Sequence, residues 1–199
     1  MRLGIFGGTF SPPHTGHVLA ARAFVKAISL DKLLIIPTFI PPHKFFGEEA
    51  SCEERLEMCR LAFGDIPSAE ISDIEILRGG KSYTYETLEE LYSEDNEIYF
   101  LVGTDMLLTF DGWKKPERIS ELCTLCYVRR EEERANDALI EKKIEKYKNL
   151  YGASIVSIDH RVTEISSSEL RQRIKDGNIG DNMLPTSVLD YIRERGLYE

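Results

Sequence analysis

Gly7-Gly8-Thr9-Phe10-Ser11-Pro12-Pro13-His14-Thr15-Gly16-His17 follows directly on the apolar run Leu3 to Phe6. The run is typical of a buried strand, the glycines allow a tight turn, and the residues from Gly16 onward predict a helix. Backbone N–H groups and the positive end of the helix dipole meet at such a junction and attract anions. His14 and His17 lie three residues apart, so on a helix both imidazoles can donate hydrogen bonds to one phosphate. The stretch therefore predicts a phosphate site.

The stretch also carries a family signature. It lacks the Gly-x-Gly-x-x-Gly and Gly-x-x-x-x-Gly-Lys-Ser/Thr patterns of other phosphate-binding turns. It resembles the (H/T)-x-G-H motif of the nucleotidyltransferase superfamily, whose members move an adenylyl or cytidylyl group onto a phosphate and release pyrophosphate. Members commonly have Asp where this chain has Ser11. Taken alone, the stretch also fits a strand-to-helix turn whose histidines merely cap the helix.

A second motif, Ile165-Ser166-Ser167-Ser168-Glu169-Leu170-Arg171, lies near the other end of the chain. Ser166 and Glu169 predict a capping box, which by itself indicates only that a helix begins. Three hydroxyls and an arginine at the positive end of a helix also favour anion binding. The segment resembles the I-S-S-T/S-x-x-R motif of the same superfamily. That resemblance implies that Ser166, Ser167, Ser168 and Arg171 grip the β and γ phosphates of ATP.

Length and composition agree with a soluble enzyme of one domain. With 199 residues, 42% of them hydrophobic, we expect a single domain over 1–199, with a C-terminal helical part at about 166–199 packed on it. The net charge of −9 argues against nucleic acid or anionic membranes as partners. The sequence shows neither a secretory signal nor a membrane-spanning stretch, so we expect a cytoplasmic protein; a homo-oligomer remains open.

Short apolar runs alternate with helical patterns along the chain. The predicted strands are Leu3 to Phe6, Leu33 to Pro37, Glu70 to Ile76, Ile98 to Val102, Thr124 to Val128 and Ala153 to Ile158. The predicted helices are Gly16 to Ile28, Cys52 to Phe63, Thr84 to Tyr92, Pro116 to Leu122, Glu131 to Tyr151, Ser167 to Lys175 and Pro185 to Arg195. This alternation predicts a Rossmann-like, doubly wound α/β fold with a mostly parallel sheet and helices on both faces. Ligands of such folds bind at the carboxyl ends of the strands, where both motifs should lie.

The four cysteines do not predict a metal site. Cys123 and Cys126 have the spacing of a zinc knuckle, but in a strand their side chains would point to opposite faces. There is no second Cys-x-x-Cys, so we expect buried thiols and no dedicated metal ligands. Arg55 and Arg60 lie on a helix of mixed charge and are expected to form salt bridges.

Three further segments narrow the family. Pro37-Thr-Phe-Ile-Pro-Pro-His43-Lys44 is a stiff loop that ends in a cation, Gly79 to Leu88 contains Ser-Tyr-Thr, and Gly103-Thr104-Asp105 precedes the single tryptophan, Trp113. With the tail Leu184 to Tyr198, these segments are similar to the motifs of the nicotinate-nucleotide adenylyltransferase family over essentially the whole chain. That family makes deamido-NAD and pyrophosphate from ATP and nicotinate mononucleotide.

The resemblance implies a role for each segment. Trp113 would stack on the pyridine ring, while backbone N–H groups around Tyr83 and Thr84 would bind the nicotinate carboxylate. Asp105 would face the adenosine ribose or a metal-bound phosphate. The remaining residues assigned to ATP are Gly7, Gly8, Thr9, Phe10 and Gly103, and Thr9 and Lys44 are assigned to the substrate. Trp113 could instead cap the core, Thr84 and Asp105 could be helix caps, and Lys44 could be an exposed loop lysine.

The implied mechanism is in-line attack of the mononucleotide phosphate on the α-phosphorus of ATP. His14, His17 and Lys44 are the expected catalytic residues, and Mg²⁺ is expected to bind through the ATP phosphates. Three alternatives are a preference for nicotinamide mononucleotide, a phosphopantetheine adenylyltransferase, and a nucleotide sensor without activity. The intact histidines, Lys44 and Arg171 argue against the sensor.

Overall fold

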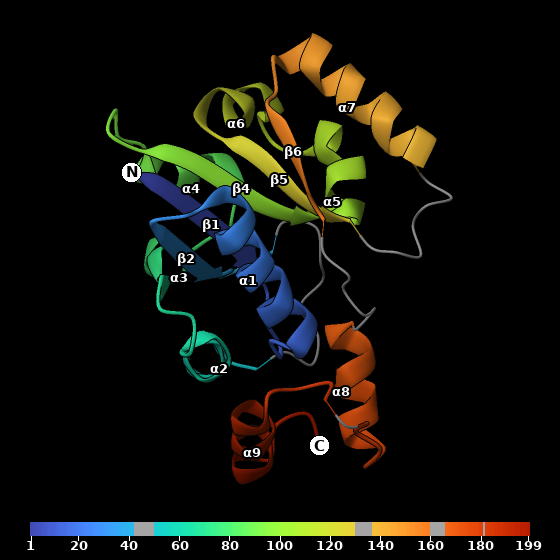
Figure 1. Ribbon diagram of the computed structural model, residues 1–199. Coiled ribbons are helices and arrows are strands. Elements are labelled where there is room, and N and C mark those ends of the chain that lie inside the picture. The colour runs from blue at the N-terminus through green and yellow to red at the C-terminus, as the bar shows by residue number, and fades with distance from the viewer. Residues whose placement is uncertain (42–49, 130–136, 160–165, 181) are drawn as a thin grey trace.

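The computed structural model describes residues 1–41, 50–129, 137–159, 166–180 and 182–199 (Figure 1). Its centre is a six-stranded sheet in the order β3-β2-β1-β4-β5-β6, and every pair of neighbouring strands is parallel. The strands are β1 (Arg2–Gly8), β2 (Lys32–Pro37), β3 (Ala69–Ile71), β4 (Glu97–Gly103), β5 (Thr124–Arg129) and β6 (Ile155–Asp159). The strand order reverses between β1 and β4, so the carboxyl ends of these two strands form the crevice where such sheets bind ligands.

Helices cover both faces of the sheet, as the alternating pattern predicted. The described helices are α1 (Thr15–Ile28), α2 (Cys52–Phe63), α3 (Ile74–Arg78), α4 (Thr84–Leu91), α5 (Thr104–Leu108), the 3₁₀ helix η1 (Phe110–Gly112), α6 (Pro116–Leu122), α7 (Asp137–Tyr151), α8 (Ser167–Lys175) and α9 (Thr186–Arg195). One core cluster joins the sheet to α1, α2, α8 and α9, and a second joins it to α4, α5, α6 and α7. None of the described helices is long and apolar enough to cross a bilayer.

The central strands β1 and β2 are mostly apolar because both faces of the sheet are buried there. Leu33 and Ile35 of β2 belong to the first core cluster, whereas Leu34 and Ile36 belong to the second. The two cysteines considered for zinc also separate: Cys126 packs in the first cluster and Cys123 in the second. Burial raises the pKa of the Cys126 thiol to about 12, which keeps it protonated at neutral pH.

Local turn residues account for the largest secondary-structure error. The strand predicted over Glu70 to Ile76 ends at Ile71, and its second half is the helix α3. The Ser72 hydroxyl accepts a hydrogen bond from the Ile74 backbone N–H, which turns the chain out of the sheet. The sequence prediction also missed α5 and η1. Within the described residues α7 begins at Asp137, and the predicted start at Glu131 lies outside them.

Candidate active site

The phosphate loop after β1 begins later than the sequence predicted. Gly7 and Gly8 pair with Ile36 and Pro37 of β2, so they are strand residues and the turn starts at Thr9. Phe10 has a positive φ of 49° and its side chain is buried between the sheet and α2, so its contribution to a ligand site is limited to its backbone. A Cβ on Gly8 would lie 3.0 Å from the Phe10 ring. Glycine therefore leaves room for the Phe10 ring, which a Cβ at this position would push aside by a few tenths of an ångström.

His14 and His17 cap α1 and stack on each other. Nδ1 of His14 accepts a hydrogen bond from the His17 backbone N–H at 3.3 Å, and Nδ1 of His17 accepts one from the His14 backbone N–H at 3.2 Å. The ring centroids are 3.6 Å apart. Because each Nδ1 is an acceptor, each neutral ring carries its proton on Nε2. The capping role is thus compatible with phosphate binding, and it fixes both rings as Nε2 donors.

The two phosphate motifs are in direct contact, although they lie at opposite ends of the sequence. The Ser167 hydroxyl donates to the Pro12 carbonyl at 3.0 Å, and Nη1 of Arg171 donates to the Ser11 carbonyl at 2.8 Å. Nη2 of Arg171 lies 3.3 Å from the Ser168 hydroxyl. In Figure 1, α8 accordingly lies beside the beginning of α1. Two helix N-termini, each bearing side-chain donors, therefore border one loop.

Only one of the two hydrogen bonds of the capping box predicted for α8 is present. The Ser166 hydroxyl accepts from the Glu169 backbone N–H at 3.2 Å, as expected. The Glu169 carboxylate instead pairs with Arg173 one turn further on, at 2.7 Å. An i, i+4 ion pair has replaced the return bond of the box.

Ser11 ties the loop to two other segments. Its side chain is fully buried, and its hydroxyl accepts from the Ala50 backbone N–H at 3.1 Å and lies 2.9 Å from the Tyr198 hydroxyl. Burial raises the pKa of Tyr198 to about 12, and the hydrogen bond with Ser11 partly opposes this rise. Ser11 thus fixes the loop to the beginning of α2 and to the C-terminal tail.

Arg55 supports the same loop, which the sequence did not predict. We expected a salt bridge, but the buried guanidinium donates from Nη1 to the carbonyls of Thr9 at 3.0 Å and Thr38 at 2.6 Å. Backbone carbonyls leave no pattern in a sequence, so a helix of mixed charge gave no sign of this role. Arg60 does form the expected kind of salt bridge, with Glu57 at 3.0 Å.

The segments assigned to the pyridine ring lie side by side. The half-buried Trp113 packs edge-on against Phe100 of β4 and Phe110 of η1. The next two residues, Lys114 and Lys115, place their ammonium groups over tyrosine rings at the start of α4. The N-cap of α4 is Tyr83, and Thr84 is its first helical residue rather than its cap. The structure therefore brings Trp113 next to the Ser-Tyr-Thr segment.

Gly103 and Asp105 stand at the carboxyl end of β4. Gly103 is the N-cap of α5, and Asp105 is an exposed residue in its first turn, so Asp105 is not the cap. A Cβ on Gly103 would lie 2.6 Å from Oδ1 of Asp105, so glycine leaves room for this carboxylate. The side chain of Thr104, between them, donates to the Val128 carbonyl at 3.1 Å and fixes the turn to β5.

A buried polar cluster, also missed from the sequence, underlies the Ser-Tyr-Thr segment. The Thr87 hydroxyl donates to Glu75 at 2.6 Å, and Arg78 donates to the Thr87 hydroxyl at 2.9 Å. Burial raises the pKa of Glu75, while the hydroxyls of Thr87 and Ser82 oppose the rise. The Ser82 hydroxyl also accepts from the Phe39 backbone N–H at 2.9 Å. The cluster joins the α4 region to the loop after β2.

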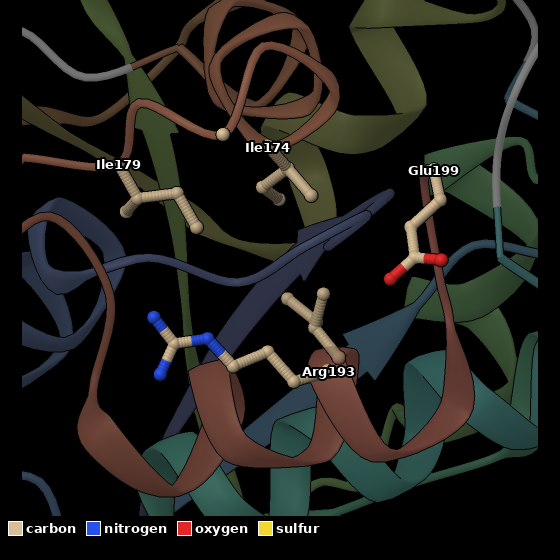
Figure 2. A pocket seen from close by; sticks show the side chains of 6 residues that line it. Ile174, Ile179, Arg193 and Glu199 are labelled. Carbon is tan, nitrogen blue, oxygen red and sulfur yellow. The ribbon is translucent and has the colours of Figure 1, made fainter.

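Lys44 and His43 lie outside the described residues, so the structure does not place them. Two hollows, of about 170 and 300 Å³, lie among the C-terminal elements. Figure 2 shows the smaller one, with Ile174 and Ile179 of the α8 side facing Arg193 of α9 and Glu199. Neither hollow is lined by the histidines or by Trp113. The described residues contain no group of three His, Cys, Asp or Glu side chains able to hold a metal ion.

Comparison with known proteins agrees with this geometry. Residues 5–173 match the cytidylyltransferase-like family. The chain is 36% identical to the probable nicotinate-nucleotide adenylyltransferase of Borrelia turicatae, over 100% of this chain and 98% of the relative. It is 37% identical to the corresponding protein of Clostridium botulinum, with the same coverage. The fold matches that of Plasmodium falciparum nicotinic acid mononucleotide adenylyltransferase complexed with APC, with a TM-score of 0.77 at 18% identity, over 99% of this chain and 96% of that one. The chain belongs to the cytidylyltransferase-like family and, within it, to the nicotinate-nucleotide adenylyltransferases.

Proposed function

We propose that this protein transfers the adenylyl group of ATP to nicotinate mononucleotide, giving deamido-NAD and pyrophosphate in NAD biosynthesis. The observation that carries this function is the contact between the two phosphate motifs, Ser167 with Pro12 and Arg171 with Ser11. A triphosphate bound at this loop has the histidines on one side and the start of α8 on the other. Relatives that align over the whole chain carry the same activity in their names.

The residues assigned to ATP are mostly hydrogen-bond donors and cations that would face its phosphates. His17 is assigned to the α-phosphate in the transition state, and His14 with Lys44 to the polyphosphate. Ser166, Ser167, Ser168 and Arg171 are assigned to the departing pyrophosphate. The contacts of Arg171 with the protein occupy part of a guanidinium that has five N–H donors, so it can hold the loop and a phosphate together. The backbone of residues 7–10, with Gly103 and Asp105, would face the nucleoside.

The mononucleotide side lies between η1 and α4. Trp113, which packs edge-on against Phe100 and Phe110, would offer an aromatic face to the electron-poor pyridine ring. The amide groups at the N-terminus of α4, around Tyr83 and Thr84, would donate to the nicotinate carboxylate. Thr9 would contact the substrate from the phosphate loop.

The geometry suits an in-line displacement without a general base. A phosphate monoester loses its second proton at about pH 6, so the attacking oxygen is already ionised at neutral pH. The protein must therefore hold two anions in line and stabilise charge on the α-phosphate and the leaving group. The Nε2 donors of His14 and His17 are fixed before substrate arrives, because their Nδ1 atoms are engaged in capping.

Mg²⁺ is the proposed cofactor. Mg²⁺ dehydrates reluctantly and commonly binds through substrate phosphates while keeping several waters, so an ion bound with ATP needs no cage of protein carboxylates. When bound in this way, it would neutralise charge on the triphosphate.

The test is pyrophosphate release with ATP and Mg²⁺ and one acceptor at a time. We expect rapid release with nicotinate mononucleotide, slower release with nicotinamide mononucleotide, and none with phosphopantetheine. Formation of deamido-NAD should match pyrophosphate mole for mole. A protein that binds ATP but releases no pyrophosphate with any acceptor would be a nucleotide sensor, and the proposed function would be wrong.

A further inference from the structure

The proposed carboxylate site lies at the N-terminus of α4, a helix that carries several acidic side chains. The chain has a net charge of −9, and α4 itself carries Glu86, Glu89 and Glu90. Glu89 pairs with Arg118 at 2.8 Å and Glu90 with Arg78 at 3.1 Å. Glu86 lies in the first turn of the helix, where Arg78 at 3.8 Å and the Tyr85 hydroxyl at 2.6 Å balance its charge only in part, so it still opposes a second carboxylate. A site selective for an acid needs additional positive charge close to this turn.

Lys114 supplies a cation at this position. Its Nζ lies 4.2 Å from the centroid of the Tyr83 ring and 6.0 Å from that of Tyr85. The contacts that the described residues give Lys114 are thus with aromatic faces, which attract an ammonium group without neutralising its charge. The side chain is exposed and directly follows Trp113, the residue assigned to the pyridine ring. The lysine therefore lies between the ring-stacking residue and the N-cap of α4.

Lys115 is a natural comparison. Its Nζ lies 4.2 Å from the centroid of the Tyr85 ring. Tyr85 is two residues further along α4 than Tyr83, whose ring Lys114 contacts. It is also exposed, and it has a positive φ of 55° at the N-cap of α6. The two lysines have the same charge and the same kind of contact, but only Lys114 lies over the N-cap residue that adjoins the proposed carboxylate donors.

We infer that Lys114 is a specificity-determining residue that favours the acid form of the mononucleotide over the amide form. This inference rests on the proposed function. Nicotinate mononucleotide carries a negative charge on its ring substituent, whereas the carboxamide of the nicotinamide form is neutral. A nearby ammonium lowers the free energy of the bound carboxylate and leaves that of the amide almost unchanged. The Tyr83 backbone N–H donates to the Lys81 carbonyl at 2.9 Å, so the amides of the first turn of α4, from Thr84 onward, would orient the group, and Lys114 adds the charge that discriminates.

The test compares kcat/KM for the two mononucleotides in the wild-type protein, Lys114→Gln, Lys114→Arg and Lys115→Gln. For Lys114→Gln we expect the ratio of nicotinate to nicotinamide form to fall about three- to tenfold, mainly through KM for the nicotinate form. Lys114→Arg should keep the wild-type ratio, and Lys115→Gln should change it less than twofold. KM for ATP should stay constant in all four proteins.

Salt gives a second measurement. Raising the ionic strength should lower the ratio of kcat/KM for the nicotinate form to kcat/KM for the nicotinamide form in the wild-type protein. The same ratio in Lys114→Gln should stay nearly unchanged. The inference is overturned if Lys114→Gln keeps the wild-type ratio, if it weakens both substrates equally, or if Lys115→Gln has the same effect. These outcomes differ from failure of the proposed function, in which the wild-type protein would make no deamido-NAD.

Discussion

The guanidinium of Arg171 donates a 2.8 Å hydrogen bond to the carbonyl of Ser11, 160 residues earlier in the chain. The bond joins the second turn of α8 to the loop that precedes α1, so a single side chain connects the two halves of the proposed phosphate site. Its removal should disturb both the shape of the loop and the charge that faces the leaving group.

We therefore expect Arg171→Ala to reduce kcat/KM for ATP about tenfold to a hundredfold, the range of a charged hydrogen bond. Arg171→Lys should recover part of this loss, since an ammonium keeps the charge but not the fork of donors. Arg173→Ala is the matched control, because Arg173 lies on the same helix and pairs with Glu169 at the surface. Steady-state kinetics in ATP are the measurement. Normal ATP kinetics in Arg171→Ala would exclude this residue from the site.

His17 should combine a catalytic and a structural role that two substitutions can separate. His17→Ala removes Nε2 and also the Nδ1 acceptor of the cap, so kcat should fall about a hundredfold or more and stability by about 1 kcal/mol. His17→Asn retains an acceptor near the position of Nδ1 and should lose kcat without losing stability. ATP affinity should change far less in both. Turnover, calorimetric ATP binding and thermal unfolding check these outcomes, and near-normal turnover in His17→Asn would remove Nε2 from the mechanism.

Tyr198 should stabilise the tail in a pH-dependent way. Its pKa in the folded protein is raised from 10.0 to about 12, so the protonated form contributes stability that is complete below pH 10 and is lost as the pH rises through 12. Tyr198→Phe should cost about 1 kcal/mol at neutral pH through the lost bond to Ser11. Its deficit should shrink between pH 9 and pH 11, because the wild type loses about 1.3 kcal/mol over that range, roughly half of what the full pKa shift implies.

Urea unfolding at several pH values measures this effect. Tyr191→Phe is the control, because Tyr191 lies on α9, just before the C-terminal tail, and its ring packs beside Arg195. The stability difference between this variant and the wild type should not shrink as the pH rises. A constant difference between Tyr198→Phe and the wild type from pH 8 to pH 11 would contradict the assignment.

Local signals explain which parts of the fold were predictable. The helices Cys52 to Phe63, Pro116 to Leu122 and Ser167 to Lys175 were predicted with the observed bounds. Ser51 and Ser166 cap two of them, and proline begins the third. The strand order and the meeting of the two phosphate motifs required the family resemblance or the structure, because no local pattern specifies which strands become neighbours.

The missed residues act through tertiary contacts. Arg55 binds carbonyls from two loops, and Glu75 is buried against a helix that starts nine residues later. Neither residue has a sequence neighbour that reveals its partner. Gly8 was assigned to a turn because glycine often turns chains, but the structure uses it to admit the Phe10 ring. The motifs predicted the candidate site residues, and the contacts show how the described ones are held in place.

A charged cluster around Asp111 supports the turn that carries Trp113. Asp111, two residues earlier, accepts hydrogen bonds from Lys146 at 2.6 Å, from Lys143 at 3.0 Å and from the Tyr147 hydroxyl at 3.2 Å. Lys146, and then Lys143, lower the pKa of Asp111 from 3.8 to about 2. A lowered carboxyl pKa means stability that is present above pH 4 and is lost as the pH falls towards 2. The cluster fixes η1 to α7 and thereby the turn that carries Trp113.

Asp111→Asn should therefore destabilise the protein by about 1 kcal/mol at pH 7, less than the full pKa shift implies because Lys146 is nearly half exposed. The difference from the wild type should narrow steadily between pH 5 and pH 3, as measured by urea unfolding. KM for nicotinate mononucleotide should rise while KM for ATP stays constant, since the loosened turn holds the ring and not the triphosphate. Asp65→Asn, which removes a surface partner of Arg22, is the control and should leave both KM values unchanged. A stability difference that is the same at pH 7 and pH 3 would show that the carboxylate of Asp111 is not held by the two lysines.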